Sequence, residues 1–192
     1  MEDSTVKLNG VDIHYRTIGN GPVLFLVSPG WGVGSGYLQR AFSALAKHLR
    51  LVFIDTRGSG LSGRPADPTR MSSVGLKAFI GQVLPLYLHR PEKSLSLAQD
   101  QLSGPISSYA FASQFAADAA FPIDQTKSLS AIRAKVLIMV GRHDYICPVA
   151  LSERLYENIP ESQLVIFEES GHLPWLEEPN AFFAELERFL IS

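Results

Sequence analysis

Two polar side chains in the last third of the chain have types and positions suited to acid–base chemistry. Asp144 lies in the segment GRHDYICP and His172 in SGHLPWLEEP, and each segment follows an apolar run. A carboxylate that accepts a hydrogen bond from a histidine Nδ1 fixes the tautomer and stabilises the imidazolium formed when the ring takes a proton. The pair therefore predicts proton transfer at a catalytic site. Two simpler interpretations stay open: Asp144 as a turn or helix-capping residue, and His172 as a structural histidine.

The elements that would position this pair are those of an α/β protein. The predicted strands are 23–27, 51–55, 135–141 and 163–172, the last running into a loop, and the predicted helices are 41–49, 151–159 and 180–190. A hairpin at residues 5–18 precedes them. A continuous apolar run such as VLFLV is typical of a strand buried on both faces of a parallel sheet. Asp144 and His172 both lie beyond the carboxyl ends of such strands, where functional residues gather.

The middle of the chain, residues 56–134, contains no run typical of a strand. Residues 76–88 and 107–121 have helical spacing and are rich in alanine or aromatic residues. We expect an apolar helical insert at 74–130 that covers a pocket as a lid, within a single domain of residues 1–192. The alternative is additional core helix.

Composition excludes several classes of function. Of the 192 residues, 46% are hydrophobic and 19% charged, and the net charge is −2, which argues against disorder and against a nucleic-acid or anionic membrane partner. Apolar runs fall well short of the ~20 residues of a membrane span, and no secretory leader is visible. One cysteine, Cys147, suits a reducing compartment, so we expect a cytoplasmic protein. We expect no cofactor, and no cluster of metal ligands stands out.

Four segments together resemble the α/β-hydrolase superfamily. SPGWGVGSGYL follows the first apolar strand, DTRGSGLS the second, GRHDYICP the third and SGHLPWLEEP the fourth. These match, in order, the family's oxyanion loop, its D-x-R-G-x-G-x-S turn, its triad acid and its triad histidine. The PGWG loop and the GH-x-P-W-x-E-E-P ending are most similar to proline iminopeptidase-like and fungal hydrolases.

The resemblance implies a shortened α/β-hydrolase fold with a mostly parallel sheet, helices on both faces and a helical lid. It implies Asp144 and His172 as catalytic residues and the Trp31 backbone N–H, beside Gly30, as an oxyanion donor. The implied reaction is hydrolysis of a small hydrophobic ester, amide or peptide-like substrate, as in serine hydrolases and peptidases. Asp55 and Arg57 would tie loops together. His14, on the polar face of an edge strand, has no expected role.

The family's nucleophile is absent from this sequence. It lies in G-x-S-x-G, on a tight turn between a strand and a helix, and no serine here has glycine at both −2 and +2. Ser62 has only Gly60, and Ser28 has only Gly30. Ser28 is the best substitute and a weak one. Two strands, two helices and their loops, roughly 45–60 residues, are missing near residues 70–76.

Three interpretations of this loss remain open. The chain is a truncated or degenerate hydrolase, through a deletion or a splicing or gene-model error; or it catalyses a non-hydrolytic proton transfer or cyclisation in a lidded apolar pocket; or it is a non-catalytic binding protein. In-frame sequence encoding G-x-S-x-G near codon 73 would establish truncation. If the sheet heals, strands 23–28 and 135–140 become parallel neighbours. If it does not, exposed strand edges favour aggregation or a homodimer.

Overall fold

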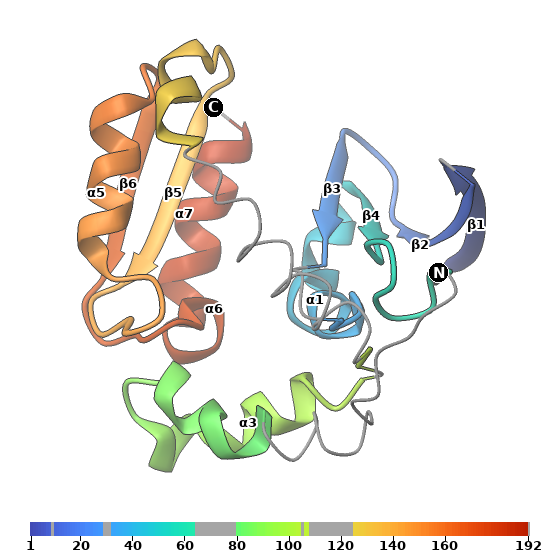
Figure 1. Cartoon of the computed structure of the whole chain (residues 1–192), viewed down its shortest axis with the longest axis horizontal. Helices are drawn as coiled ribbons and strands as arrows, with labels where there is room; N and C mark the ends of the chain where they lie inside the picture. Colours follow the sequence, from blue (N-terminus) through green and yellow to red (C-terminus); the bar gives the residue numbers. More distant parts are fainter. Residues whose placement is uncertain (9, 29–31, 64–79, 105, 108–124, 192) are drawn as a thin grey trace. The chain divides into compact units, whose positions relative to one another are not determined.

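The strands of the chain form two separate sheets in the computed structural model, which describes all residues except 9, 29–31, 64–79, 105, 108–124 and 192 (Figure 1). One sheet has the order β1-β2-β4-β3, and the other pairs β5 with β6. The chain divides accordingly into two units. Unit 1 comprises Met1–Ile80 and Gln99–Pro122, and unit 2 comprises Gly81–Ala98 and Ile123–Ser192.

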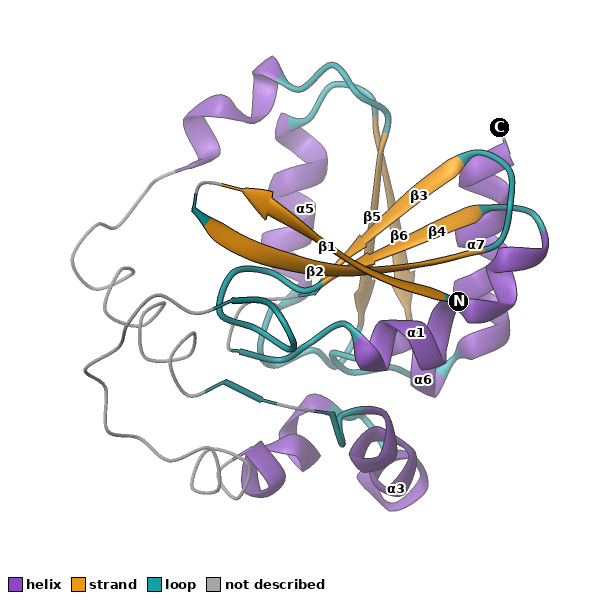
Figure 2. Ribbon diagram, turned by 90° about the vertical axis from the view of Figure 1, so that its right-hand side faces the viewer, coloured by secondary structure: helices purple, strands orange, loops and turns teal. Residues whose placement is uncertain are grey.

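The sheet of unit 1 begins with the predicted hairpin. β1 (Glu2–Leu8) and β2 (Val11–Ile18) pair antiparallel, and β2 pairs antiparallel with β4 (Arg50–Ile54). β4 in turn pairs parallel with β3 (Val23–Val27), as Figure 2 shows. The hairpin, both later strands and their parallel pairing were all predictable from the sequence.

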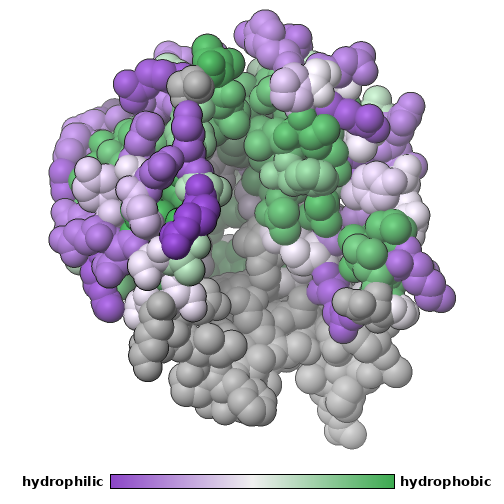
Figure 3. Space-filling view, turned by 90° about the horizontal axis from the view of Figure 1, so that it is seen from above, coloured by the Kyte–Doolittle hydropathy of each residue, from purple (hydrophilic) through white to green (hydrophobic). Residues whose placement is uncertain are grey.

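The expectation that β3 is buried on both faces is wrong. Its side chains alternate between exposed and half-buried, with Val23, Phe25 and Val27 on the exposed side. β4 shows the opposite behaviour, because Leu51 and Phe53 are fully buried. One side of β3 therefore presents apolar side chains to the surface. Green, apolar areas gather on the face of the molecule that Figure 3 shows.

The helix predicted at 41–49 begins earlier and changes type. α1 spans Gly36–Phe42, and a 3₁₀ turn, η1, follows at Ser43–Lys47. The Ser43 hydroxyl donates to the Gln39 carbonyl oxygen at the junction. Such side-chain bonding to the preceding turn competes with regular helix geometry, and the tighter 3₁₀ form is common at helix ends. Tyr37, Leu38 and Phe42 are buried on α1.

A buried carboxylate, Asp55, organises the loops of unit 1. It accepts backbone N–H bonds from Ser35 at 2.6 Å and Leu61 at 2.8 Å, and it lies 3.2 Å from the His14 Nδ1. Gly60, at φ +52°, is required in this turn because a Cβ would lie 2.2 Å from the carboxylate. Asp55 therefore ties loops together, as expected. His14, by contrast, was misjudged: it is buried on an inner strand and also contacts Asp3 at 2.8 Å.

Unit 2 confirms the predicted α/β ending. The predicted elements appear as β5 (Val136–Gly141), α5 (Val149–Asn158), β6 (Ser162–Phe167) and α7 (Pro179–Ile191). β5 and β6 pair in parallel, and α5 and α7 lie on opposite sides of them (Figure 1). The remaining elements are η2 (Leu84–Tyr87), α3 (Pro91–Gln101), η3 (Gln125–Ala131) and α6 (Pro174–Glu177).

The segment expected to form a lid, 74–130, is described at 80–104, 106–107 and 125–130, and nothing there tests the lid, which remains a prediction. Its described part contains α3, which the sequence analysis did not predict. α3 begins at Pro91, a favourable first helical position because proline's fixed φ suits the helix and its missing N–H would be unpaired there. None of the helices that the structure describes is long and apolar enough to span a bilayer.

The sequence left open whether the sheet heals, and a healed sheet is not seen among the described residues. β3 belongs to the four-stranded sheet of unit 1, and β5 belongs to the two-stranded sheet of unit 2. Within the described residues, β3 pairs only with β4, and β5 pairs only with β6. Each of these strands therefore keeps one edge without a strand partner.

The Asp55 network predicts a large stability effect. Asp55→Ala leaves the buried N–H groups of Ser35 and Leu61 without their acceptor, so we expect a loss of about 3 kcal/mol in the free energy of unfolding. Asp12→Ala, at an exposed position on β2, is the matched control and should change it by less than about 0.5 kcal/mol. Urea unfolding measures both, and equal midpoints would contradict the assigned role.

Candidate active site

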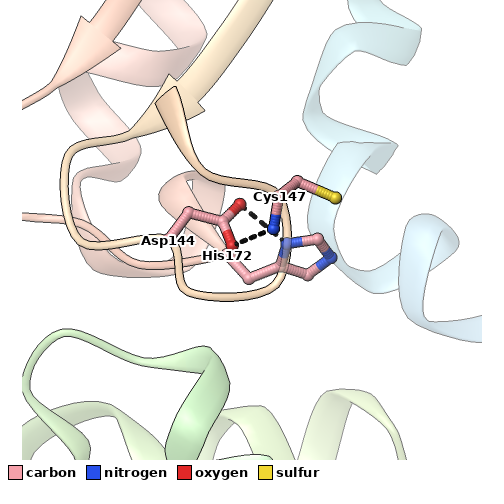
Figure 4. Close-up of side chains that lie close together, drawn as sticks. All are labelled: Asp144, Cys147 and His172. Carbon is pink, nitrogen blue, oxygen red and sulfur yellow. Dashed lines mark hydrogen bonds and ion pairs between the residues drawn. The ribbon is translucent and has the colours of Figure 1, made fainter. Parts of the chain in front are cut away.

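Asp144 and His172 lie side by side, as the sequence predicts (Figure 4). The His172 Nδ1 is 2.8 Å from the Asp144 Oδ2. The Asp144 side chain is buried, whereas the His172 ring is about one-third exposed, at 30%. A buried acid thus holds a histidine whose ring still reaches the surface of unit 2.

Local backbone structure fixes the position of Asp144. It follows β5 in a tight turn, where its N–H donates to the Gly141 carbonyl at 3.2 Å. Its Oδ1 accepts the N–H groups of Ile146 and Cys147, both at 2.8 Å. One carboxylate oxygen thus orders the loop, which leaves the other for the histidine. The turn interpretation of Asp144 and the catalytic one are therefore compatible.

Gly141 allows the two loops to meet. A Cβ at this position would lie 2.0 Å from the Gly171 carbonyl oxygen and 2.3 Å from that of Ser170. The His143 N–H donates to the same Ser170 carbonyl at 2.9 Å. Any side chain at 141 would therefore push the His172 loop away from the Asp144 loop.

A third segment, which contains Tyr87, holds His172 in place. Its backbone N–H donates to the Tyr87 carbonyl at 2.7 Å, and its ring stands edge-on to the Tyr87 ring, with centroids 5.1 Å apart. The Glu177 carboxylate accepts backbone N–H bonds from His89 at 2.9 Å and from Gly171 at 2.7 Å. Glu177 thus ties the Tyr87 segment to the histidine loop.

Sequence reasoning missed the role of the two adjacent glutamates. Glu178 accepts the Ser170 hydroxyl at 2.5 Å and the Glu169 N–H at 3.0 Å. Together with Glu177 it orders the loop that carries His172. The signal was present in the E-E-P ending of SGHLPWLEEP. Trp175, in the same segment, packs against Phe182, with ring centroids 6.2 Å apart.

The geometry leaves one nitrogen of His172 for chemistry. An ionised carboxylate only accepts hydrogen bonds, so the bond to Asp144 assigns the proton to Nδ1 and the lone pair to Nε2. A neutral Nε2 can take a proton from water or from a substrate hydroxyl, and Asp144 would then stabilise the imidazolium. The arrangement has the geometry of a general base.

Cys147 is the third reactive side chain of this cluster. One ligand-type atom from each of Asp144, Cys147 and His172 lies within 4.8 Å of the others. Nitrogen, sulfur and carboxylate oxygen suit Zn²⁺, but a cation bound between them would compete with the Asp144–His172 hydrogen bond. Burial raises the pKa of the Cys147 thiol, and the Asp144 charge raises this pKa further. Burial likewise raises the pKa of Tyr87, with smaller contributions from Cys147 and Asp144.

The remaining predicted site residues belong to unit 1. The Ser28 hydroxyl is buried, accepts the Thr56 N–H at 3.0 Å and lies 3.2 Å from the Thr56 hydroxyl. It therefore links the ends of β3 and β4. Trp31 and Gly30, the predicted oxyanion residues, lie outside the described residues.

Short stretches of several curated relatives match the chain, although no family model does. The chain is 42% identical over 69 residues to the AB hydrolase superfamily protein YclE of Bacillus subtilis (strain 168), which is 35% of this chain and 25% of that protein. It is 37% identical over 68 residues to the pimeloyl-[acyl-carrier protein] methyl ester esterase of Aliivibrio salmonicida, 35% of this chain and 26% of the relative. A proline iminopeptidase of Saccharolobus solfataricus is 34% identical over 67 residues, 35% of this chain and 21% of the relative. The chain spans about a quarter of the length of these relatives.

Solved structures share the fold over nearly the whole chain. A thermophilic esterase from Thermogutta terrifontis has a TM-score of 0.77 at 16% identity, covering 99% of this chain and 98% of that one. The enol-lactonase from Burkholderia xenovorans has a TM-score of 0.76 at 18% identity, covering 98% and 100%. These likenesses confirm the predicted shortened α/β-hydrolase fold. The matched stretches of the curated relatives, 35% of this chain, agree with the resemblance of the four ordered motifs to the α/β-hydrolase superfamily.

Proposed function

We propose that this chain is an ester- or amide-hydrolase family protein in which the Asp144–His172 dyad acts as a general base without a serine nucleophile. The observation that carries the proposal is the 2.8 Å Nδ1–Oδ2 contact in a chain that lacks G-x-S-x-G. The matched relatives include a methyl ester esterase and a proline iminopeptidase, which support this reaction class. Truncation explains how a hydrolase chain came to lack the elbow.

The dyad would act on water in place of an enzyme hydroxyl. His172 Nε2 takes a proton as the water oxygen forms a bond to the carbonyl carbon, and Asp144 stabilises the resulting imidazolium. The tetrahedral species then expels the alcohol or amine, which receives that proton from Nε2. Triads that lose a member retain roughly 10³–10⁴-fold catalysis over water from the oxyanion hole and binding. We therefore expect weak turnover of activated esters.

The substrate class is small, apolar esters, amides or peptide-like molecules. The partly buried Tyr87 ring beside His172 would lie against the acyl or leaving group. Three further aromatic residues of the predicted lid segment, Tyr109, Phe111 and Phe115, lie outside the described residues. A non-hydrolytic proton transfer or cyclisation would use the same base, and it differs only in whether water is incorporated. A binding protein would retain ligand without turnover.

Substitution of the dyad tests the proposed base. We expect His172→Ala to lower p-nitrophenyl acetate hydrolysis by about 10²-fold, because the proton acceptor is lost. Asp144→Asn should lower it by roughly tenfold or more, because the imidazolium loses its counter-charge. His48→Ala is the matched control, since His48 is exposed in unit 1 and reports adventitious imidazole catalysis. Equal rates for all three variants would refute the proposal.

A serine-directed probe tests the absence of a nucleophile. We expect no stoichiometric fluorophosphonate adduct by intact mass, because a reactive serine needs both a base within reach and an oxyanion pocket facing the attacked atom. The best substitute, Ser28, already accepts a hydrogen bond from the Thr56 N–H through its hydroxyl oxygen. A single adduct that disappears in His172→Ala would show that the chain has a working serine after all.

The thiol of Cys147 gives a third, independent measurement. Its raised pKa means a smaller thiolate fraction than free cysteine at neutral pH, so alkylation by iodoacetamide should be slower and its rate should rise at higher pH. Asp144→Asn removes the charge contribution but not the burial, so alkylation should accelerate without matching free cysteine. A pH midpoint below that of free cysteine would instead indicate a thiol activated by His172 and a cysteine-based mechanism.

A further inference from the structure

β3 presents an open edge on the sheet of unit 1. It is the terminal strand in the order β1-β2-β4-β3, and among the described residues only β4 pairs with it. The parallel register runs from Val23 opposite Arg50 to Val27 opposite Ile54. The far side of β3 therefore has a row of main-chain groups that no described strand satisfies.

The hydrogen bonds at the two ends of β3 show which residues face this edge. The Pro22 carbonyl accepts the Arg50 N–H at 2.9 Å, and the Ser28 N–H donates to the Ile54 carbonyl at 2.9 Å. Because successive residues of a strand direct their main-chain groups to opposite sides, the even-numbered residues from 22 to 28 face β4. Val23, Phe25 and Val27 thus direct both N–H and C=O toward the open edge.

The same residues lack the features that protect natural strand edges. Their side chains are 54%, 62% and 55% exposed, in that order, and the strand contains neither a charge nor a proline. Charged residues, proline and bulges are the usual defences against pairing with another chain. β1, at the opposite edge of the sheet, does carry charges: Glu2, Asp3 and Lys7. Only the β3 edge is left both apolar and unprotected.

We infer that β3 pairs antiparallel with β3 of a second copy of this chain, around a two-fold axis at Phe25. The sequence VLFLV reads identically in both directions. An antiparallel pair centred on Phe25 therefore sets valine against valine, leucine against leucine and phenylalanine against phenylalanine. In this register every outward N–H and C=O of Val23, Phe25 and Val27 finds a partner, because these residues form the hydrogen-bonded pairs of the ladder.

A closed dimer fits this edge better than a longer assembly. β5 also has an edge without a described strand partner, but its residues are buried or half-buried. A ladder between β3 of one copy and β5 of another would be parallel and head-to-tail, so it would continue into a longer assembly. The palindromic sequence of β3 would contribute nothing to such pairing. A five-residue ladder buries less than the roughly 1,200 Å² typical of stable complexes. We therefore expect a weak dimer whose population rises with protein concentration.

Sedimentation velocity of the full chain over a range of micromolar concentrations tests the dimer. The wild type should shift from monomer to dimer. Phe25→Lys should sediment as monomer throughout, because it places two like charges opposite each other at the axis. Leu86→Lys is the matched control, since Leu86 in unit 2 is also 62% exposed, and it should dimerise like the wild type. Circular dichroism checks that each variant folds, and Val23→Lys replaces Phe25→Lys if the latter does not.

Cross-linking tests the register. In a Cys147→Ser background, Phe25→Cys should give a covalent dimer with a short thiol-reactive cross-linker, because facing Cα atoms in such a pair lie ~5.5 Å apart. Leu86→Cys should give none. A wild type that stays monomeric at every concentration would overturn the inference, as would a dimer that Phe25→Lys leaves unchanged. Assemblies that keep growing beyond the dimer would indicate head-to-tail pairing and would also overturn the inference.

Discussion

A buried carboxylate just beyond the carboxyl end of a parallel strand organises each unit of this chain. Asp55 follows β4 and collects the N–H groups of two loops together with the His14 ring. Asp144 follows β5, orders its own turn with one oxygen and holds His172 with the other. The burial of each charge is tolerated because donors surround it. The order of the loops around each acid depends on these hydrogen bonds.

The sequence predicts those parts of the fold that depend on interactions between residues close together in the chain. Alternation predicted the β1–β2 hairpin, and apolar runs with flanking turns predicted β5 and β6 and placed Asp144 beside His172. The error at β3 has a different origin. An apolar run such as VLFLV signals burial on both faces only if another element covers each face, and periodicity says nothing about whether that element is present. The role of Glu177 was hidden for a related reason, since it bonds main-chain groups 87 or 88 positions away.

The site shows how catalytic machinery divides into separable parts. The acid and base come from two adjacent strands and from loops that Gly141 allows to touch, so their geometry depends only on unit 2. The nucleophile of the superfamily belongs to a strand, turn and helix that this sequence does not contain. The truncation that we propose would remove the acyl-enzyme route but leave a histidine whose Nδ1 is held by Asp144. Such a residue can still move a proton, which is why we assign water activation to it and not nucleophilic attack.

The proposed loss of a segment would also account for the open edge of β3. A central strand normally satisfies main-chain groups on both sides, whereas among the described residues β3 pairs on one side only, with β4. Water can satisfy these groups, but the apolar side chains beside them gain by leaving water. A second β3 offers both hydrogen-bond partners for the main chain and apolar contacts for the side chains. The palindromic order of its residues lets two identical strands pair without mismatch. The loss that we propose for the nucleophile segment would thus also create a strand edge complementary to itself.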